Sequence, residues 1–293
     1  MKLVFLGTGT SHGVPVIGCE CEVCKSKDAR DRRYRCSAYI TSNTDKNILI
    51  DIGPEFRLQA IENNIKKIDA LLLTHSHADH LHGIDDIRSF SCDSFNKPKD
   101  EQSAKKVNAP PIPIFTNKET ADDVRTRFGY FFIPSKEGGG HAKVNLNEVS
   151  APFEAADLTV TPIPMQHGHL ETVGWLLTQK EEDSSKTSIA YLTDCNYISD
   201  ESIEKIHRNC GKLEHLIIDG LRVKEHSTHF NFLQALDAAQ KIGANHVWLI
   251  HLTHNLSHIQ VIDYINEHLG EFPKLQAEAK SVLPAYDRLE ISC

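Results

Sequence analysis

Short apolar runs recur along this chain, and polar or glycine-containing segments separate them. Several of the runs alternate with longer amphipathic stretches, a pattern that predicts strands and helices following one another. We expect strands at 3–6, 36–41, 47–52, 68–73, 112–115, 144–149, 158–163, 174–178, 188–192, 216–218 and 246–251. We expect helices at 55–64, 78–88, 118–128 and 231–242. This order indicates an α/β protein, in which functional residues collect at one end of the sheets.

Residues that can bind a metal directly follow the strand predicted at 68–73. They form the segment Thr74-His75-Ser76-His77-Ala78-Asp79-His80. A strand that delivers the first two histidines and a helical turn that delivers the aspartate and third histidine would gather four side chains around one point. Imidazole and carboxylate suit divalent metals such as Zn²⁺, and ligand pairs this close indicate two metals. A merely histidine-rich polar loop would leave these groups against a buried strand without a ligand.

The same pattern recurs at other strand ends. His167, Asp194 and His251 each stand at or shortly beyond the end of a predicted strand. Asp194 could cap a helix, but a two-metal site would also require a bridging carboxylate of this kind. Asp51 ends an apolar run, where it could cap a helix or orient a metal-bound histidine. The recurrence indicates one metal centre assembled from several strand ends.

A second candidate metal site is the C-x-C-x-x-C cluster of Cys19, Cys21 and Cys24. The chain has eight cysteines and no segment resembling a secretory signal, so we expect reduced thiols and a cytoplasmic protein. Clustered cysteines under those conditions are more often metal ligands than disulfides. A tetrahedral zinc would need a fourth ligand from elsewhere in the chain.

Composition narrows the class of protein further. A chain of 293 residues with 40% hydrophobic and 25% charged residues is typical of a soluble globular protein. No apolar run is long enough to cross a bilayer. The formal net charge of −8 disfavours nucleic-acid binding through the overall field, although it leaves a local basic groove open. The polar segment 91–111 is predicted to be a surface insertion.

Taken together, these residues resemble the metallo-β-lactamase superfamily over essentially the whole chain. Its H-x-H-x-D-H motif is complete, and a later His, Asp and His follow in the expected order. Within the superfamily the chain is most similar to PhnP-type cyclic phosphodiesterases and, more distantly, to tRNase Z. Three features support this similarity: Gly7-Thr8-Gly9 with Gly13 and Pro15; the cysteine cluster; and His251-Leu252-Thr253-His254. The resemblance implies an αββα sandwich of two mixed β-sheets flanked by helices, formed as one domain over 1–293 with a zinc-binding loop at 19–24.

The resemblance also implies the roles of the site residues. One divalent metal, Zn or Mn, would be held by His75, His77 and His167. A second would be held by Asp79, His80 and His251, with Asp194 bridging the two. A structural zinc would be held by Cys19, Cys21, Cys24 and His254. Asp51 is the candidate for orienting a ligand, and Asp79 and His229 are the residues assigned to catalysis. His229 would protonate a departing oxygen, and a helix cap or surface residue is its alternative.

The implied reaction is hydrolysis of a small or cyclic phosphodiester, such as a phosphoribosyl cyclic phosphate, by a hydroxide bridging two metals. We expect a small-molecule substrate and no membrane partner, and we leave a homodimer open. A tRNase Z-like nuclease would need a basic RNA-binding arm that no segment supplies. A thioester or lactam hydrolase of the same fold would not need the cysteine cluster. A non-catalytic zinc-stabilised binding module would have no use for metals with open coordination positions.

Overall fold

Two seven-stranded β-sheets form the centre of the computed structural model, in which residues 1–91, 110–133 and 141–293 are described. The first sheet has the order β14-β1-β2-β3-β4-β5-β6, and the second has the order β13-β12-β11-β10-β9-β8-β7. The strands of the first sheet are β1 (Lys2–Gly7), β2 (Ser37–Thr41), β3 (Asn47–Ile50), β4 (Ala70–Leu72), β5 (Ile112–Thr116), β6 (Val144–Glu148) and β14 (Glu290–Ser292). Those of the second are β7 (Phe153–Ala155), β8 (Leu158–His167), β9 (Leu170–Lys180), β10 (Lys186–Leu192), β11 (Lys212–Asp219), β12 (His246–Ile250) and β13 (Ser281–Pro284).

Both sheets are mixed. In the first, β1 pairs antiparallel with β14 and β2, whereas β3 to β6 run parallel. In the second, β7 to β10 are antiparallel, and β10 to β13 are parallel. Parallel strands begin and end at the same edge, so residues that follow them meet there.

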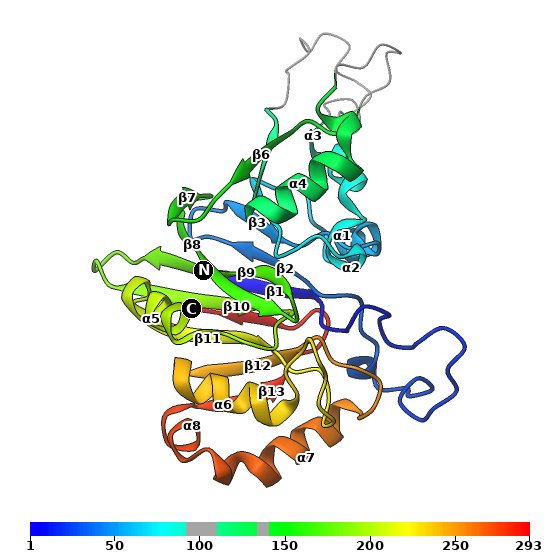
Figure 1. Ribbon diagram of the computed structural model, residues 1–293, viewed down its shortest axis with the longest axis vertical. Coiled ribbons are helices and arrows are strands. Elements are labelled where there is room, and N and C mark those ends of the chain that lie inside the picture. The colour runs from blue at the N-terminus through cyan, green and yellow to red at the C-terminus, as the bar shows by residue number, and fades with distance from the viewer. Residues whose placement is uncertain (92–109, 134–140) are drawn as a thin grey trace.

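Helices cover the outer face of each sheet (Figure 1). They are α1 (Phe56–Glu62), α2 (Ala78–Leu81), α3 (Arg88–Ser91), α4 (Lys118–Arg127), α5 (Asp200–Asn209), α6 (Phe232–Ile242), α7 (His258–His268) and α8 (Pro273–Glu278). Short 3₁₀ turns are η1 (Ala29–Asp31), η2 (Ile84–Ile87), η3 (Gly129–Phe131) and η4 (Leu269–Glu271). No helix in the described part of the chain combines the length and the apolar character needed to cross a membrane.

Buried apolar side chains fill the spaces between four layers. The middle cluster lies between the sheets and includes Phe5, Trp175 and Tyr191. A second cluster lies beneath α1 to α4, and a third beneath α5 to α8. This arrangement of helices, two mixed sheets and helices confirms the predicted αββα sandwich.

The predicted strands agree with this topology, but the helix predicted at 78–88 is wrong as one element. It is broken into α2, η2 and α3. Gly83 is the reason, since its N–H donates to the carbonyl of Ile52 at 2.9 Å. A Cβ at Gly83 would lie only 2.0 Å from the carbonyl oxygen of Gly53. The close approach holds the short helix α2 against the loop that follows β3.

The predicted surface insertion falls largely beyond the described residues. Of the residues 91–111 assigned to it, 92–109 lie outside the described ranges, as do residues 134–140 further along the chain. Before that second gap, Phe131 is buried, whereas Phe132 and Ile133 are exposed.

Candidate metal centre

The seven ligands predicted from the sequence lie together in two groups. The first contains His75, His77 and His167, and the second contains Asp79, His80, Asp194 and His251. Within each group the potential ligand atoms all lie within 4.8 Å of one another. The elements explain the convergence, because these residues follow β4, lie on α2, or end or follow β8, β10 and β12. The grouping is the one that the sequence resemblance implied.

Three buried residues at this edge have left-handed backbone conformations. The φ angles are 57° at Asp51, 55° at Asp194 and 61° at His251, and each residue stands just beyond a strand. Such a conformation costs about 1–3 kcal/mol for a residue other than glycine and persists only where the surroundings impose it. At these three positions the chain therefore carries an aspartate or a histidine at some cost in stability.

The burial, hydrogen bonding and spacing of the ring nitrogens indicate whether this centre could hold a metal. Nε2 of His75, His80 and His251 is buried and has no hydrogen-bond partner within the ranges 1–91, 110–133 and 141–293. Nε2 of His80 lies 3.1 Å from Asp194 Oδ2, and Nε2 of His251 lies 3.2 Å from Asp194 Oδ1, both outside hydrogen-bonding geometry. Ligand atoms on a tetrahedral ion with bonds of 2.0–2.1 Å are about 3.3 Å apart. The donor types, their spacing and their orphaned nitrogens therefore fit divalent metals.

Hydrogen bonds to Nδ1 orient the imidazole rings of three candidate ligands, His75, His80 and His167. Nδ1 of His80 donates to Asp51 Oδ2 at 2.7 Å. Asp51 also accepts the backbone N–H and the hydroxyl of Thr74, each at 2.8 Å. Because the Thr74 hydroxyl donates to Asp51, it accepts from Nδ1 of His75 at 3.0 Å. Nδ1 of His167 donates to the carbonyl of Thr228 at 2.7 Å. These bonds leave the Nε2 lone pairs free for a metal.

The charges in this centre are strongly coupled. Burial would lower the pKa of His80, but the carboxylates of Asp194, Asp79 and Asp51 raise the pKa well above the usual range. Burial would raise the pKa of Asp194, but His251 and His80 hold that pKa well below its usual range. For His75, burial and then the neighbouring His80 lower the pKa well below the ordinary value. In the metal-free centre these shifts favour an ionised Asp194 and a protonated His80.

His229 is buried beside both ligand groups. Its ring is stacked on that of His251 and edge-on to that of His167, with centroids 4.5 Å apart in each case. Nδ1 of His229 donates to Asp219 Oδ2 at 2.7 Å. Burial would lower the pKa of His229, but the Asp219 carboxylate outweighs it and raises the pKa. The cap of α6 is Asn231, so His229 does not serve as a helix cap.

Asp219 was not assigned a role from the sequence. It ends β11, so it carries the same signal as the predicted ligands, a carboxylate at the end of an apolar strand. Its Oδ2 also accepts the N–H of Cys195 at 2.9 Å. The pattern could have identified Asp219 as part of the centre, but only the folded chain pairs it with His229.

The cysteine cluster converges on His254. Nδ1 of His254 lies 3.4 Å from Sγ of Cys19, 3.4 Å from that of Cys21 and 3.3 Å from that of Cys24. Sulfur and nitrogen ligands of a tetrahedral zinc are about 3.6 Å apart. Backbone N–H groups of Cys24 and Val16 point at Sγ of Cys21 and Cys24 respectively, both at 3.4 Å. The four residues thus fit a zinc ion.

Thiol acidity differs within this cluster. The N–H of Cys24 is the main influence that lowers the pKa of Cys21 to about 6, whereas burial raises the pKa of Cys24 to about 11.

Backbone hydrogen bonds connect the N-terminal segment to the strand end that carries His251. Leu252 donates to the carbonyl of Thr8 at 3.0 Å, and Thr10 donates to that of Leu252 at 3.2 Å. The cluster therefore lies in a loop (dark blue in Figure 1) that is joined to the metal centre.

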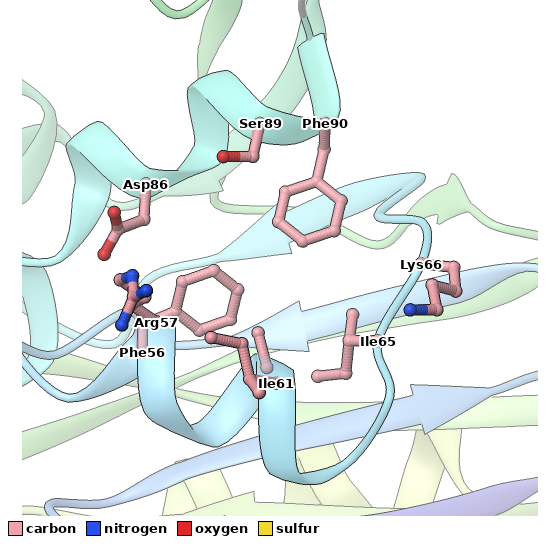
Figure 2. A pocket seen from close by; sticks show the side chains of 9 residues that line it. Phe56, Arg57, Ile61, Ile65, Lys66, Asp86, Ser89 and Phe90 are labelled. Atoms are coloured by element: carbon pink, nitrogen blue, oxygen red, sulfur yellow. The ribbon is translucent and has the colours of Figure 1, made fainter. Parts of the chain in front are cut away.

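A separate cavity of about 300 Å³ lies between α1 and α3 (Figure 2). Phe56, Ile65 and Phe90 contribute to its apolar walls, and Arg57 and Lys66 stand on its rim. None of the candidate ligands lines this cavity. It is therefore distinct from the metal centre.

Comparisons with known proteins agree with the fold. Residues 46–252 match the model of the beta-lactamase superfamily domain. The crystal structure of a diphosphatase from the PhnP family is 33% identical, with a TM-score of 0.77 over 100% of this chain and 97% of that one. This chain therefore belongs to the metallo-β-lactamase superfamily, whose members are mainly hydrolases, and within it is PhnP-like.

Two further relatives extend the comparison. Zn²⁺-bound PqqB from Methylobacterium extorquens shares the fold, with a TM-score of 0.72 and 16% identity over 100% of both chains. An octanoyltransferase from Porphyromonas gingivalis (strain ATCC BAA-308 / W83) is 36% identical over 258 residues, which are 87% of this chain and 46% of that protein. The chain spans about half the length of that relative.

Proposed function

We propose that this chain is a metal-dependent phosphodiesterase that acts on a small or cyclic phosphodiester. The observation that carries the proposal is the buried His229–Asp219 pair, at 2.7 Å, beside two groups of metal ligands. Cleavage of a phosphodiester expels an oxygen that must take up a proton, and the centre has a histidine suited to supply it. The likeness to a protein described as a PhnP-family diphosphatase supports cleavage at phosphorus.

The seven ligands would hold two divalent ions, Zn or Mn. When bound, such ions supply positive charge beside the phosphoryl oxygens and lower the pKa of a coordinated water. His75, His77 and His167 would hold the first ion, and Asp79, His80 and His251 the second. Asp194 would contact both, since its two oxygens face His80 and His251 and its Oδ1 lies 3.9 Å from Nε2 of His75.

His229 would act as the general acid. One of its ring nitrogens lies within 4.8 Å of ligand atoms of His167 and Asp194. Because Nδ1 is bound to Asp219, the proton available for transfer is the one on Nε2. The raised pKa of His229 favours the imidazolium, and Asp219 stabilises it until the proton moves to the leaving oxygen. A positioned acid of this kind contributes about 100- to 10,000-fold to the rate.

The cysteine cluster would hold a structural zinc through Cys19, Cys21, Cys24 and His254. Its role would be to fix the loop that is hydrogen-bonded to the strand end carrying His251. Structural zinc sites can contribute on the order of 10 kcal/mol to folding at neutral pH. The proposed protein is cytoplasmic and acts on a small molecule rather than on nucleic acid or membrane.

Hydrolysis of bis(p-nitrophenyl) phosphate and of a ribosyl cyclic phosphate, with Mn²⁺ or Zn²⁺ added to chelator-treated protein, tests the proposal. We expect metal-dependent hydrolysis of both compounds. Protein that binds two metals in the centre but cleaves no phosphodiester would refute it. Inorganic and nucleoside diphosphates belong in the same panel, because the PhnP-family relative is described as a diphosphatase.

A second candidate is hydrolysis of an acyl thioester, favoured by the relative named octanoyltransferase. The shared region is 46% of that protein, so the remaining half contains sequence that this chain does not match. Octanoyl-coenzyme A is the matching test substrate. A thiolate leaves without a proton more readily than an alkoxide does, so replacing His229 should affect thioester cleavage little. Metal-dependent cleavage of this thioester alone would replace the phosphodiesterase proposal.

A further inference from the structure

In the first ligand group, one imidazole receives no hydrogen bond from the residues that the structure describes. Nδ1 of His75 and Nδ1 of His167 each have a hydrogen-bond partner. His77 is exposed, and no hydrogen bond from the described residues reaches either of its ring nitrogens. Metal-binding histidines almost always have such a partner, which fixes the ring and the tautomer. Among the described residues, the contacts that orient His77 are then the edge contacts of its ring with His75 and His167 and the bonds that hold its backbone.

The backbone next to His77 is held by a closed set of hydrogen bonds. Arg127 Nη1 donates to the carbonyl oxygen of Ser76 at 2.6 Å, and Arg127 Nη2 donates to Asp123 Oδ2 at 2.8 Å. The hydroxyl of Ser76 completes the set by donating to the same oxygen of Asp123. The carbonyl of Ser76 belongs to the peptide group whose nitrogen is that of His77. Holding it fixes the direction in which the His77 side chain leaves the chain.

Asp123 and Arg127, which bind Ser76, lie on a helix that is itself well anchored. Asp123 and Arg127 are one turn apart on α4, which Asn117 caps at its N-terminus through the N–H of Thr120. Ala121 and Val124 of the same helix are fully buried against the first sheet. By contrast, residues 73–77 form no regular element between β4 and α2. The irregular segment that carries two ligands is thus anchored to a helix from later in the chain.

We propose that Asp123 and Arg127 are positioning residues for the first metal, acting on His77 through Ser76. They take the place of the ring hydrogen bond that His77 lacks. The inference rests on the proposed assignment of His75, His77 and His167 to one metal. Loss of partners that orient a ligand typically reduces metal affinity about 10- to 100-fold. We expect that loss at the first metal and not at the second.

Helix α4 also offers a matched control pair. Asp122 and Arg125 lie on the same helix and form an ion pair at 3.0 Å. Their remaining bonds go to Lys118, Thr126 and Glu148, and none goes to Ser76. Their side-chain exposures of 52% and 44% are close to the 42% and 40% of Asp123 and Arg127. Replacing them alters the charge and helicity of α4 to a similar degree without releasing Ser76.

The test is Co²⁺ affinity, measured by competition with a chromophoric chelator. Asp123→Asn, Arg127→Met and Ser76→Ala are compared with Asp122→Asn and Arg125→Met. A His251→Ala background weakens the second group, so that the first ion is measured alone. We expect the first three variants to bind this ion about 10- to 100-fold more weakly, with an altered Co²⁺ absorption band. Arg127→Lys should fall between Arg127→Met and the parent protein, because one ammonium cannot reproduce the paired bonds.

Affinities within twofold of the control variants would overturn the inference. So would equal weakening of both metals when the same variants are titrated without His251→Ala, since that would indicate general loosening of α4. The melting temperature of the metal-free variants is read in parallel, and it should match that of the controls. Because no substrate is involved, this outcome is separate from the proposed function. Unmodified protein that binds no ion in the centre would contradict that function, whereas normal binding by the variants would contradict only the positioning role.

Discussion

Replacing Asp219 by asparagine tests the proton donor most sharply. The substitution keeps the shape of a buried side chain but removes the charge that Nδ1 of His229 contacts at 2.7 Å. Burial, which lowers the pKa of His229, then acts with its main opposing carboxylate gone. A pKa below the ordinary value of about 6.5 leaves less than about a quarter of the imidazole protonated at pH 7. The asparagine carbonyl oxygen could also accept from Nδ1 of the neutral ring, which would place its one proton on Nδ1 and leave none on Nε2 to transfer.

The size of the effect should depend on the leaving group. For a cyclic or alkyl phosphodiester we expect kcat to fall about 100- to 10,000-fold, the usual contribution of a positioned general acid. For bis(p-nitrophenyl) phosphate we expect less than about a tenfold loss, because a nitrophenolate departs without protonation. The same contrast is expected for His229→Gln.

The pH dependence of kcat gives an independent test of the role of His229. The folded protein raises the pKa of His229, so the acid is available below that pKa and is lost as the pH rises through it. The alkaline limb of kcat should therefore move to lower pH in Asp219→Asn. Equal losses on both substrates, at unchanged metal content and with an unmoved alkaline limb, would refute the role assigned to this pair.

The remaining predictions concern the metals. Metal binding should release protons, because the carboxylates raise the pKa of His80 in the metal-free centre and a histidine ligand must be neutral. Calorimetry in buffers of different ionisation enthalpy would show this proton release, and heats that do not depend on the buffer would contradict it. Affinity should likewise fall as the pH is lowered. Cys21→Ser should remove one zinc per chain and lower the melting temperature while the centre still binds two ions, and loss of all metal would contradict separate sites. Asp194→Ala should weaken both ions in the centre, as titration with Mn²⁺ would reveal, whereas loss of one ion alone would show that this carboxylate does not contact both.

The candidate ligands could be identified from the sequence because each is encoded locally. An apolar run followed directly by a histidine or aspartate marks a strand end, and parallel strands bring such ends together. His75 and His77 also share a motif with the turn that follows, so that spacing alone places four ligands. The fold followed from the same residues through their family resemblance.

What could not be predicted depends on contacts between distant segments. The break in the helix expected at 78–88 comes from the close approach of Gly83 to Gly53, which no local pattern records. Ser76 meets Asp123 and Arg127 only when α4 packs on the sheet, 47 and 51 residues further along. Asp219 also ends an apolar strand, but its proposed role depends on its hydrogen bond with His229. Partners of this kind are set by tertiary geometry rather than by periodicity.

The most direct test of the central claim is a metal titration followed by activity. Protein that retains the zinc of its cysteine cluster but has a metal-free centre is titrated with Mn²⁺ while hydrolysis of a cyclic phosphodiester is measured. We expect activity to rise from background to a plateau at two equivalents of Mn²⁺ per chain, and we expect His77→Ala and His251→Ala not to reach this plateau. Absence of hydrolysis after two equivalents have bound would contradict it.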